Sequence, residues 1–240
     1  MTLGRPGPLT AEALIELSGA ASRLSPGKWA LALLRAAYPS AAEDDVLDLT
    51  VGSRDRAILA ARRQFAGDMI AAEPVCESCG KVFELSFSQA DVGLAEPSDA
   101  DPGFRAVEVE GRALQLRPVT VADLLAVEHI VDTHAATARL AALVTGQDEA
   151  DAMPVEAIGE ALEEIDPAAD VWLATTCPEC GHSQLIAFDP VHFTAAEIRH
   201  SAQRILQDVV DIARAFHWSE RDILALPDDR RAWYVAAATG

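Results

Sequence analysis

Basic side chains are scarce in this 240-residue chain. Its 19 Lys and Arg residues face 38 Asp and Glu residues, which gives a formal net charge of −19 at pH 7. Nucleic-acid binding needs clustered Lys and Arg that neutralise phosphates, and an anionic membrane surface attracts the same side chains. The composition therefore argues against a nucleic-acid-binding surface and against a role on a membrane surface.

Aromatic residues are also few, at 5% of the chain, although half of all residues are apolar. Alanine and aliphatic side chains must then fill most of the core, and alanine is the best helix former. A chain of this length buries roughly 70–75% of the surface that it exposes when unfolded, so it needs no disulfide framework to fold. We expect an α+β protein that is mostly α-helical.

Long apolar runs are missing. No run approaches the roughly 20 residues that span a bilayer, and Met1–Pro8 lacks the basic start and hydrophobic stretch of a secretory signal. We therefore expect a cytoplasmic protein without membrane insertion. The sequence also has no glycine-rich phosphate loop, no Gly-x-Ser-x-Gly element and no cysteine with a convincing base partner. These absences favour a non-enzymatic protein with no small-molecule substrate.

Only four cysteines are present, in two Cys-x-x-Cys-Gly motifs at Cys76–Gly80 and Cys177–Gly181. In a reducing compartment, thiols at this spacing are metal ligands more often than disulfides. Each motif lies between two strand-like runs, as in a zinc knuckle, where glycine allows a positive φ. Four thiolates saturate a tetrahedral site, which predicts one structural Zn²⁺ per chain and no catalytic metal. Its predicted ligands are Cys76, Cys79, Cys177 and Cys180.

Other interpretations of the cysteines stay open. The thiols could pair in the core without a metal, or serve a thioredoxin-like redox role, although that motif belongs at a helix N-terminus. His182, next to the second motif, fits a solvent-facing position better than a ligand position. The two motifs are about a hundred residues apart, whereas a compact zinc ribbon separates its pairs by roughly 15–20 residues. A single ribbon would thus contain a long, largely helical insertion.

The two hairpins organise the predicted domains. We expect an N-terminal helical region, two zinc-ribbon halves, an insertion of short strands and helices, and a C-terminal segment with one long and two short helices. The boundaries are residues 1–70, residues 71–90 together with 170–190, residues 91–169, and residues 191–240.

Local signals predict individual elements within these regions. Val46–Leu49 has the composition of a short strand. Thr120–Asp123 resembles a capping box that opens a helix running to about Leu143, and Thr194–Glu197 forms a second capping box before the longest helix.

The C-terminal stretch Arg214–Tyr234 holds much of the scarce aromatic content. Such side chains either pack on the long helix or anchor a partner protein. The candidate partner-binding residues are Trp218, Ile223, Leu224, Trp233 and Tyr234.

Two stretches of the sequence resemble a known family. The first runs from Leu49 through the Ala60–Phe65 segment into Cys76–Gly80, and the second runs from the Cys177–His182 motif to the tail His217–Arg231. They resemble baseplate and tail-assembly proteins of contractile-tailed phages, including T-even type baseplate hub proteins, and their relatives in phage-derived contractile injection systems. The tail pattern Trp-Ser-Glu-x-Asp-Ile-Leu-x-Leu with paired Arg is the more specific element.

This resemblance implies a structural component or assembly factor of a baseplate, built in the cytoplasm, that either stays in the assembled particle or leaves it. It implies baseplate, tube or spike proteins as partners. The strong negative charge agrees with such a role, because it keeps a free subunit soluble and complements basic patches on a partner. The alternative is a zinc-ribbon regulatory adaptor that contacts the transcription machinery or nucleic acid; the charge disfavours its nucleic-acid form.

Overall fold

The computed structural model describes residues 3–94, 103–109, 111–147 and 155–239, which form ten helices and six strands. The helices are α1 (Ala11–Ala20), α2 (Pro26–Ala37), α3 (Glu43–Leu47), α4 (Val51–Ala66), α5 (Val121–Val127), α6 (Thr133–Thr145), α7 (Val155–Ile165), α8 (Pro190–Phe216), α9 (Glu220–Leu224) and α10 (Asp228–Thr239). The strands are β1 (Met69–Ala72), β2 (Leu85–Ser88), β3 (Arg105–Val109), β4 (Arg112–Leu116), β5 (Val171–Thr176) and β6 (Ser183–Phe188).

The described strands pair as three separate antiparallel hairpins, β1 with β2, β3 with β4 and β5 with β6. The chain is thus a mixed α/β protein, mainly helical with small antiparallel hairpins, as the composition predicts. Among the described helices, none combines the length and apolar character needed to cross a bilayer. Three parts of the predicted insertion, residues 95–102, residue 110 and residues 148–154, lie outside the described residues.

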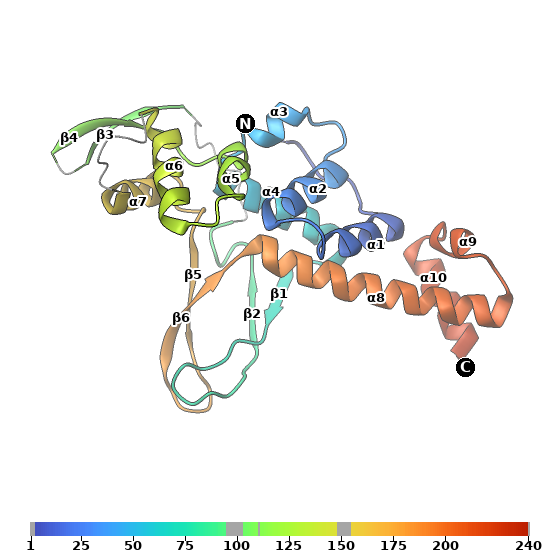
Figure 1. Cartoon of the computed structure of the whole chain (residues 1–240). Helices are drawn as coiled ribbons and strands as arrows, with labels where there is room; N and C mark the ends of the chain where they lie inside the picture. The colour runs from blue at the N-terminus through green and yellow to red at the C-terminus, as the bar shows by residue number, and fades with distance from the viewer. Residues whose placement is uncertain (1–2, 95–102, 110, 148–154, 240) are drawn as a thin grey trace.

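The main core lies where α1, α2 and α4 meet the first half of α8 (Figure 1). Trp29 of α2 is its largest apolar member, and the indole Nε1 donates a hydrogen bond of 3.0 Å to the carbonyl of Leu17 in α1. Only Asp189 separates β6 from α8, and this helix then runs along α1. It therefore connects the base of a hairpin rigidly to the helical body.

The structure corrects the predicted strand at Val46–Leu49. Residues Glu43–Leu47 form helix α3, and three acidic residues occupy its first turn. Carboxylates are favoured there, because the N-terminal end of a helix carries partial positive charge. The apolar residues that resemble a strand belong instead to the buried side of this short helix and to the residues after it.

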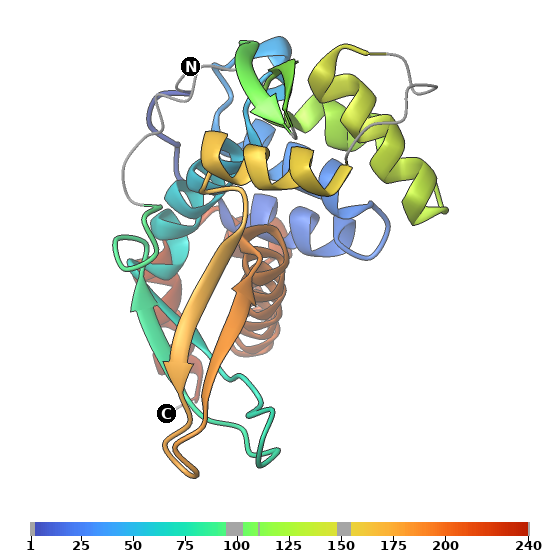
Figure 2. The same ribbon diagram turned by 90° about the vertical axis from the view of Figure 1, so that its left-hand side faces the viewer.

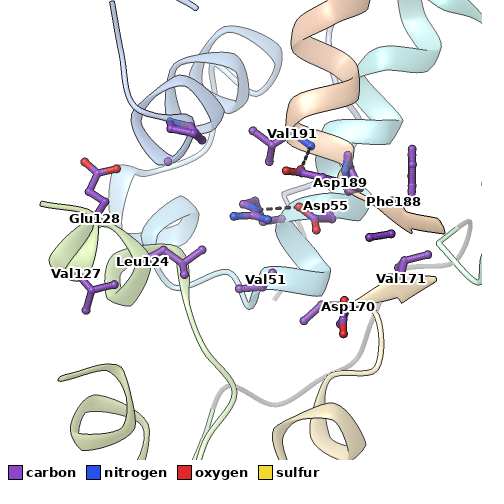
Figure 3. A pocket seen from close by; sticks show the side chains of 16 residues that line it. Val51, Asp55, Leu124, Val127, Glu128, Asp170, Val171, Phe188, Asp189 and Val191 are labelled. Carbon is purple, nitrogen blue, oxygen red and sulfur yellow. Dashed lines mark hydrogen bonds and ion pairs between the residues drawn. The ribbon is translucent and has the colours of Figure 1, made fainter. Parts of the chain in front are cut away.

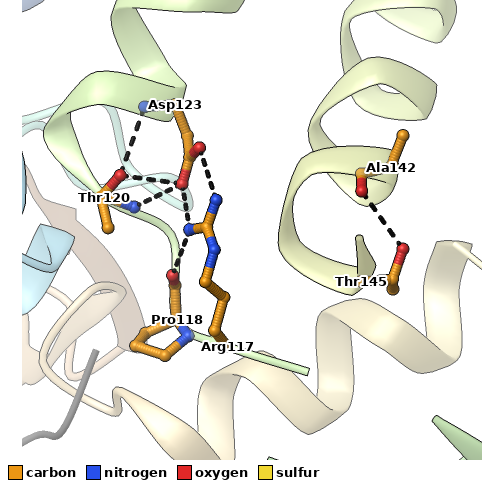
Figure 4. A network of polar contacts seen from close by, with 6 residues as sticks. All are labelled: Arg117, Pro118, Thr120, Asp123, Ala142 and Thr145. Atoms are coloured by element: carbon orange, nitrogen blue, oxygen red, sulfur yellow. Dashed lines mark hydrogen bonds and ion pairs between the residues drawn. The ribbon is translucent and has the colours of Figure 1, made fainter. Parts of the chain in front are cut away.

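The Thr120–Asp123 capping box is confirmed, and it belongs to a larger polar network (Figure 4). Arg117 donates to both carboxylate oxygens of Asp123, at 2.5 and 2.9 Å, while Thr120 donates to Asp123 from its backbone and its hydroxyl, both at 2.9 Å. The predicted single helix to Leu143 is wrong: α5 ends at Val127, and α6 begins at Thr133. The cause is a new N-cap at Asp132, whose side chain accepts from two backbone N–H groups.

The second predicted capping box, Thr194–Glu197, is also wrong. Helix α8 begins at Pro190, and its N-cap is Asp189, five residues before Thr194; Asp189 accepts from the N–H groups of Val191 and His192. Asp followed by Pro at the first helical position is the stronger start signal, because Pro needs no hydrogen-bond acceptor there and its φ is already helical. Thr194 and Glu197 lie within the helix.

Candidate metal centre

The hairpins β1–β2 and β5–β6 project side by side from the helical body, with their tips together (Figures 1 and 2). Apolar side chains fill the space between them nearer the body. The rings of Phe87 and Phe188 meet edge to face at a centroid distance of 5.1 Å, and Leu85, Leu173 and Ile70 belong to the same apolar group. This contact aligns the two tips, which carry the cysteines.

The two cysteine turns are near copies of each other. In each, the N–H of the first cysteine donates to the carbonyl five residues on, and the glycine N–H donates back to the carbonyl of that cysteine. The distances are 2.8 and 2.9 Å around Cys76, and 2.9 and 3.0 Å around Cys177. Gly80 and Gly181 have φ values of +70° and +74°, which side chains other than glycine rarely adopt. Both turns therefore direct two thiols to one side.

The four sulfur atoms converge on one point. All lie within 4.8 Å of one another, with 3.6 Å between Cys76 and Cys180 and 3.8 Å between Cys79 and Cys177. A tetrahedral thiolate site with metal–sulfur bonds of about 2.3 Å has sulfur–sulfur edges of about 3.8 Å. The four cysteines, brought together from positions about a hundred residues apart, can therefore hold one metal ion.

The environment of the thiols favours at least one thiolate. Backbone N–H donors, first that of Cys79 and then that of Ser78, lower the pKa of Cys76 to about 6. For Cys180 the N–H of His182 lowers the pKa, but burial and the neighbouring thiols outweigh it and raise the value to about 11. The thiolate is the form that binds metal, so the lowered pKa of Cys76 suits this thiol to metal binding.

Direct contacts also hold the two tips together. Gln184 of β6 accepts a hydrogen bond of 3.0 Å from the N–H of Glu77 and donates one of 3.2 Å to the carbonyl of Val75. Lys81 forms an exposed ion pair of 2.5 Å with Glu179 across the two turns. Gln184 was not predicted from the sequence. The available signal was its place two residues before Ile186 in β6, because alternate residues of a strand share one face and Ile186 packs against the cysteines.

Burial divides the ligand set into an inner and an outer pair. Cys76 and Cys177 are buried beneath Phe83 and Ile186, whereas Cys79 and Cys180 are exposed. The side chain of His182 is exposed, as the sequence suggests, and its carbonyl closes the second turn. The metal position is therefore covered on one side by apolar side chains and open to solvent near the other.

Helices α9 and α10, which contain four of the five candidate partner-binding residues, lie at the far end of α8, away from the hairpin tips (Figure 1). Ile223 is fully buried against Val209 and Ile212, so it serves the core there. Tyr234 contacts the rings of Phe216, Trp218 and Trp233. Trp233 is 66% exposed, Trp218 is 36% exposed, and Leu224 is partly buried. The two tryptophans are thus the most accessible members of the set.

No family model, no curated protein and no solved structure matches this chain. Its own residues, the four-cysteine cluster above all, are the basis for the functional proposal.

Proposed function

We propose that this protein is a non-enzymatic, zinc-stabilised structural component or assembly factor of a contractile phage tail or contractile injection system baseplate. The observation that carries the structural part of this proposal is the convergence of four cysteine sulfurs on one point. Four protein ligands leave a tetrahedral metal no open position for water or substrate, which is the mark of a structural site.

Zinc is the metal that this donor set favours. Soft thiolate ligands in a tetrahedral arrangement select Zn²⁺ or iron–sulfur chemistry, whereas Mg²⁺ and Ca²⁺ require oxygen ligands. One ion per chain fits the single cluster found among the described residues. The two hairpins then correspond to the halves of a zinc ribbon, with residues 91–169 as the insertion.

The role of the ion would be to staple the hairpins. Two-stranded hairpins are only marginally stable alone, and these two leave the helical body together. Binding free energies of structural zinc sites in peptides are on the order of 10–16 kcal/mol at neutral pH, which is comparable with the stability of a whole domain. Zinc would thus fix the two tips relative to each other and, through α8, relative to the helical body.

The assignment to a baseplate is supported by the sequence resemblance and by charge. The motif from Trp218 to Leu226 is its most specific element. A net charge of −19 favours association with basic surfaces on baseplate, tube or spike proteins and disfavours nucleic acid.

Two measurements on the protein from its native source test the proposal. Elemental analysis should give one zinc per chain, and X-ray absorption should show four sulfur ligands with no nitrogen or oxygen. Affinity purification of the tagged chain should recover baseplate, tube or spike proteins in fixed stoichiometry. Oxygen or nitrogen ligands would contradict the structural site, and stable recovery of transcription proteins instead would favour the regulatory adaptor.

A further inference from the structure

A pocket of about 530 Å³ lies where the helical body meets the base of the β5–β6 hairpin (Figure 3). Residues from α2, α4, α5 and α8 line it, together with the ends of β5 and β6. Most of its wall is apolar, and the residues that form this wall include Val51, Leu124, Val127, Phe188 and Val191. The pocket is separate from the cysteine cluster, which lies at the hairpin tips.

The pocket contains a buried carboxylate that is only half satisfied. Asp55 is 3% exposed, and its Oδ1 accepts a hydrogen bond of 2.7 Å from Nε of Arg54. Its Oδ2 accepts no hydrogen bond from the described part of the chain. In Figure 3 this second oxygen lies on the side of the pocket where Asp170 and Val171 are drawn. Oδ2 is not among the fully buried oxygens that lack a partner, so it keeps contact with the pocket space, and a donor group that enters the pocket can reach it.

Negative charge exceeds positive charge around this oxygen. Asp170 and Asp189 also line the pocket. Both are exposed, and Asp189 accepts hydrogen bonds from the N–H groups that begin α8, while Arg54 is the one basic side chain among the described residues of the lining. The pKa of Asp55 is raised to about 6, chiefly by burial and to a lesser extent by the charges of Asp189 and Asp166, against the lowering effect of Arg54. A second cation would relieve this repulsion. Glu128, another carboxylate in the lining, is already paired with its own lysine.

We infer that the pocket binds an alkylammonium or alkylguanidinium group, presented as a lysine or arginine side chain of a partner protein, with the charged end at Asp55. The methylene stem of such a side chain would pack on Leu124 and Val127, as long basic side chains do on apolar surfaces. The strongly acidic chain attracts basic partners. A metal ion fits poorly, because the cysteines are the one group found among the described residues whose ligand atoms converge closely enough. This inference does not depend on the metal centre or on the baseplate assignment.

Peptide binding to the full zinc-loaded chain at pH 7.5 tests the inference. The probes are acetyl-Ala-Ala-Lys-Ala-Ala-amide, the same peptide with Arg, and the same peptide with norleucine, which keeps the stem and lacks the charge. We expect saturable amide shifts at Val51, Asp55 and Val191 in two-dimensional NMR with the charged peptides, and at least tenfold weaker binding of norleucine. No saturable shift up to 20 mM, or equal binding of norleucine, overturns the inference. If free butylamine binds as tightly as the lysine peptide, the pocket is a site for a small amine, and the inference of a partner side chain is overturned.

Variants locate the site. Asp55→Asn should weaken binding of the charged peptides at least tenfold, because the neutral amide no longer attracts a cation. Leu124→Trp keeps the carboxylate, fills the pocket and should also abolish binding, so it serves where Asp55→Asn fails to fold. Asp68→Asn removes an exposed carboxylate, which is paired with Arg63 outside the pocket, and should leave binding unchanged. Unchanged binding in both pocket variants would overturn the assignment.

Discussion

The guanidinium of Arg62 donates two hydrogen bonds to the carboxylate of Glu197, at 2.5 and 2.7 Å, from a side chain that is 1% exposed. It also donates to the carbonyls of Gly67 and Met69, both at 2.8 Å, and lies 5.7 Å from the ring centroid of Phe193. One side chain therefore joins the end of α4, the start of β1 and the first turns of α8. The first hairpin leaves the helical body at this point.

Replacing this residue should destabilise the protein strongly. Arg62→Ala leaves a carboxylate and two carbonyls without their donor, and breaking a buried ion pair from one side typically costs about 3–5 kcal/mol. The variant Arg35→Ala is the control, because Arg35 is 50% exposed and pairs with the exposed Glu43. It should cost less than about 1 kcal/mol. Urea denaturation followed by circular dichroism compares the two, and similar losses would show that the Arg62 contacts contribute little.

The shared metal centre makes a symmetric prediction. Cys76→Ser and Cys177→Ser should each lower the zinc content and the thermal midpoint by similar amounts, because each removes one buried ligand of the same ion. Elemental analysis and calorimetry measure the two effects. Ser78→Ala changes an exposed side chain within the first turn and should retain a full equivalent of zinc. A full equivalent of zinc in either cysteine variant would contradict the single site.

The sequence predicted best those features whose signal is local. Each cysteine turn is defined by residues close to one another in the sequence, the two cysteines and the glycine. The donors and acceptors of the Thr120–Asp123 box likewise lie within four residues of chain. The Thr194–Glu197 pair has the same local pattern, but it does not form a capping box. Asp189 and Pro190 start the helix earlier, and Glu197 is used by a residue of α4 that lies 135 positions away.

Contacts between distant residues could not be predicted in this way. Asp166 has the sequence context of a turn residue, yet its Oδ2 accepts a hydrogen bond of 2.8 Å from the N–H of Gly52, which is 114 positions earlier. Likewise, Asp55 belongs to a helix with many charged residues, yet its side chain is buried where α4 meets neighbouring helices and the base of the β5–β6 hairpin. Such partners are set by tertiary packing, which one sequence does not show.

Replacing two helical glycines with alanine, at Gly52 beside Asp166 and at Gly159, should change stability in opposite directions. A Cβ on Gly52 would lie 2.2 Å from Oδ1 of Asp166 and 2.7 Å from Cβ of Ala168, so Gly52→Ala must displace a buried residue. Such overpacking typically costs about 1–3 kcal/mol. A Cβ on Gly159 in α7 would meet no atom of the described residues within 4 Å, and Gly159→Ala should stabilise by roughly 0.5–1 kcal/mol through helix propensity. Thermal denaturation distinguishes the two signs, and a stabilising Gly52→Ala would refute the close approach.

Asp123 should lose its stabilising effect in acid. Burial raises its pKa, but the hydrogen bonds from Arg117 and Thr120 outweigh burial and hold it below the ordinary value of 3.8. A carboxyl with a lowered folded-state pKa stabilises the fold above its unfolded pKa, and this contribution disappears as the pH falls through the folded value. Asp123→Asn should therefore be less stable than the natural protein at pH 7, by about 2–3 kcal/mol for lost charged hydrogen bonds. In urea titrations, the difference in unfolding free energy between the two proteins should become smaller below pH 4. A difference that does not change with pH would contradict the ion pair.

Asp55 should show the opposite pH dependence. Its pKa is raised from 3.8 to about 6, chiefly by burial, so between these values the folded protein holds a proton that the unfolded chain has released. Its contribution to stability therefore falls as the pH rises through this window, by on the order of 3 kcal/mol. Asp55→Asn cannot titrate and should lack this loss.

The difference in unfolding free energy between the variant and the natural protein isolates Asp55, because protonation of the cysteines affects both proteins equally. Urea titrations at pH 4, 5, 6 and 7 should show the variant gaining relative to the natural protein as the pH rises. This gain should shrink when a saturating lysine peptide is present, since a bound cation stabilises the ionised carboxylate and lowers its pKa. A difference that stays constant from pH 4 to pH 7 would mean that Asp55 is ionised throughout, and that its single hydrogen bond from Arg54 is enough to hold the charge.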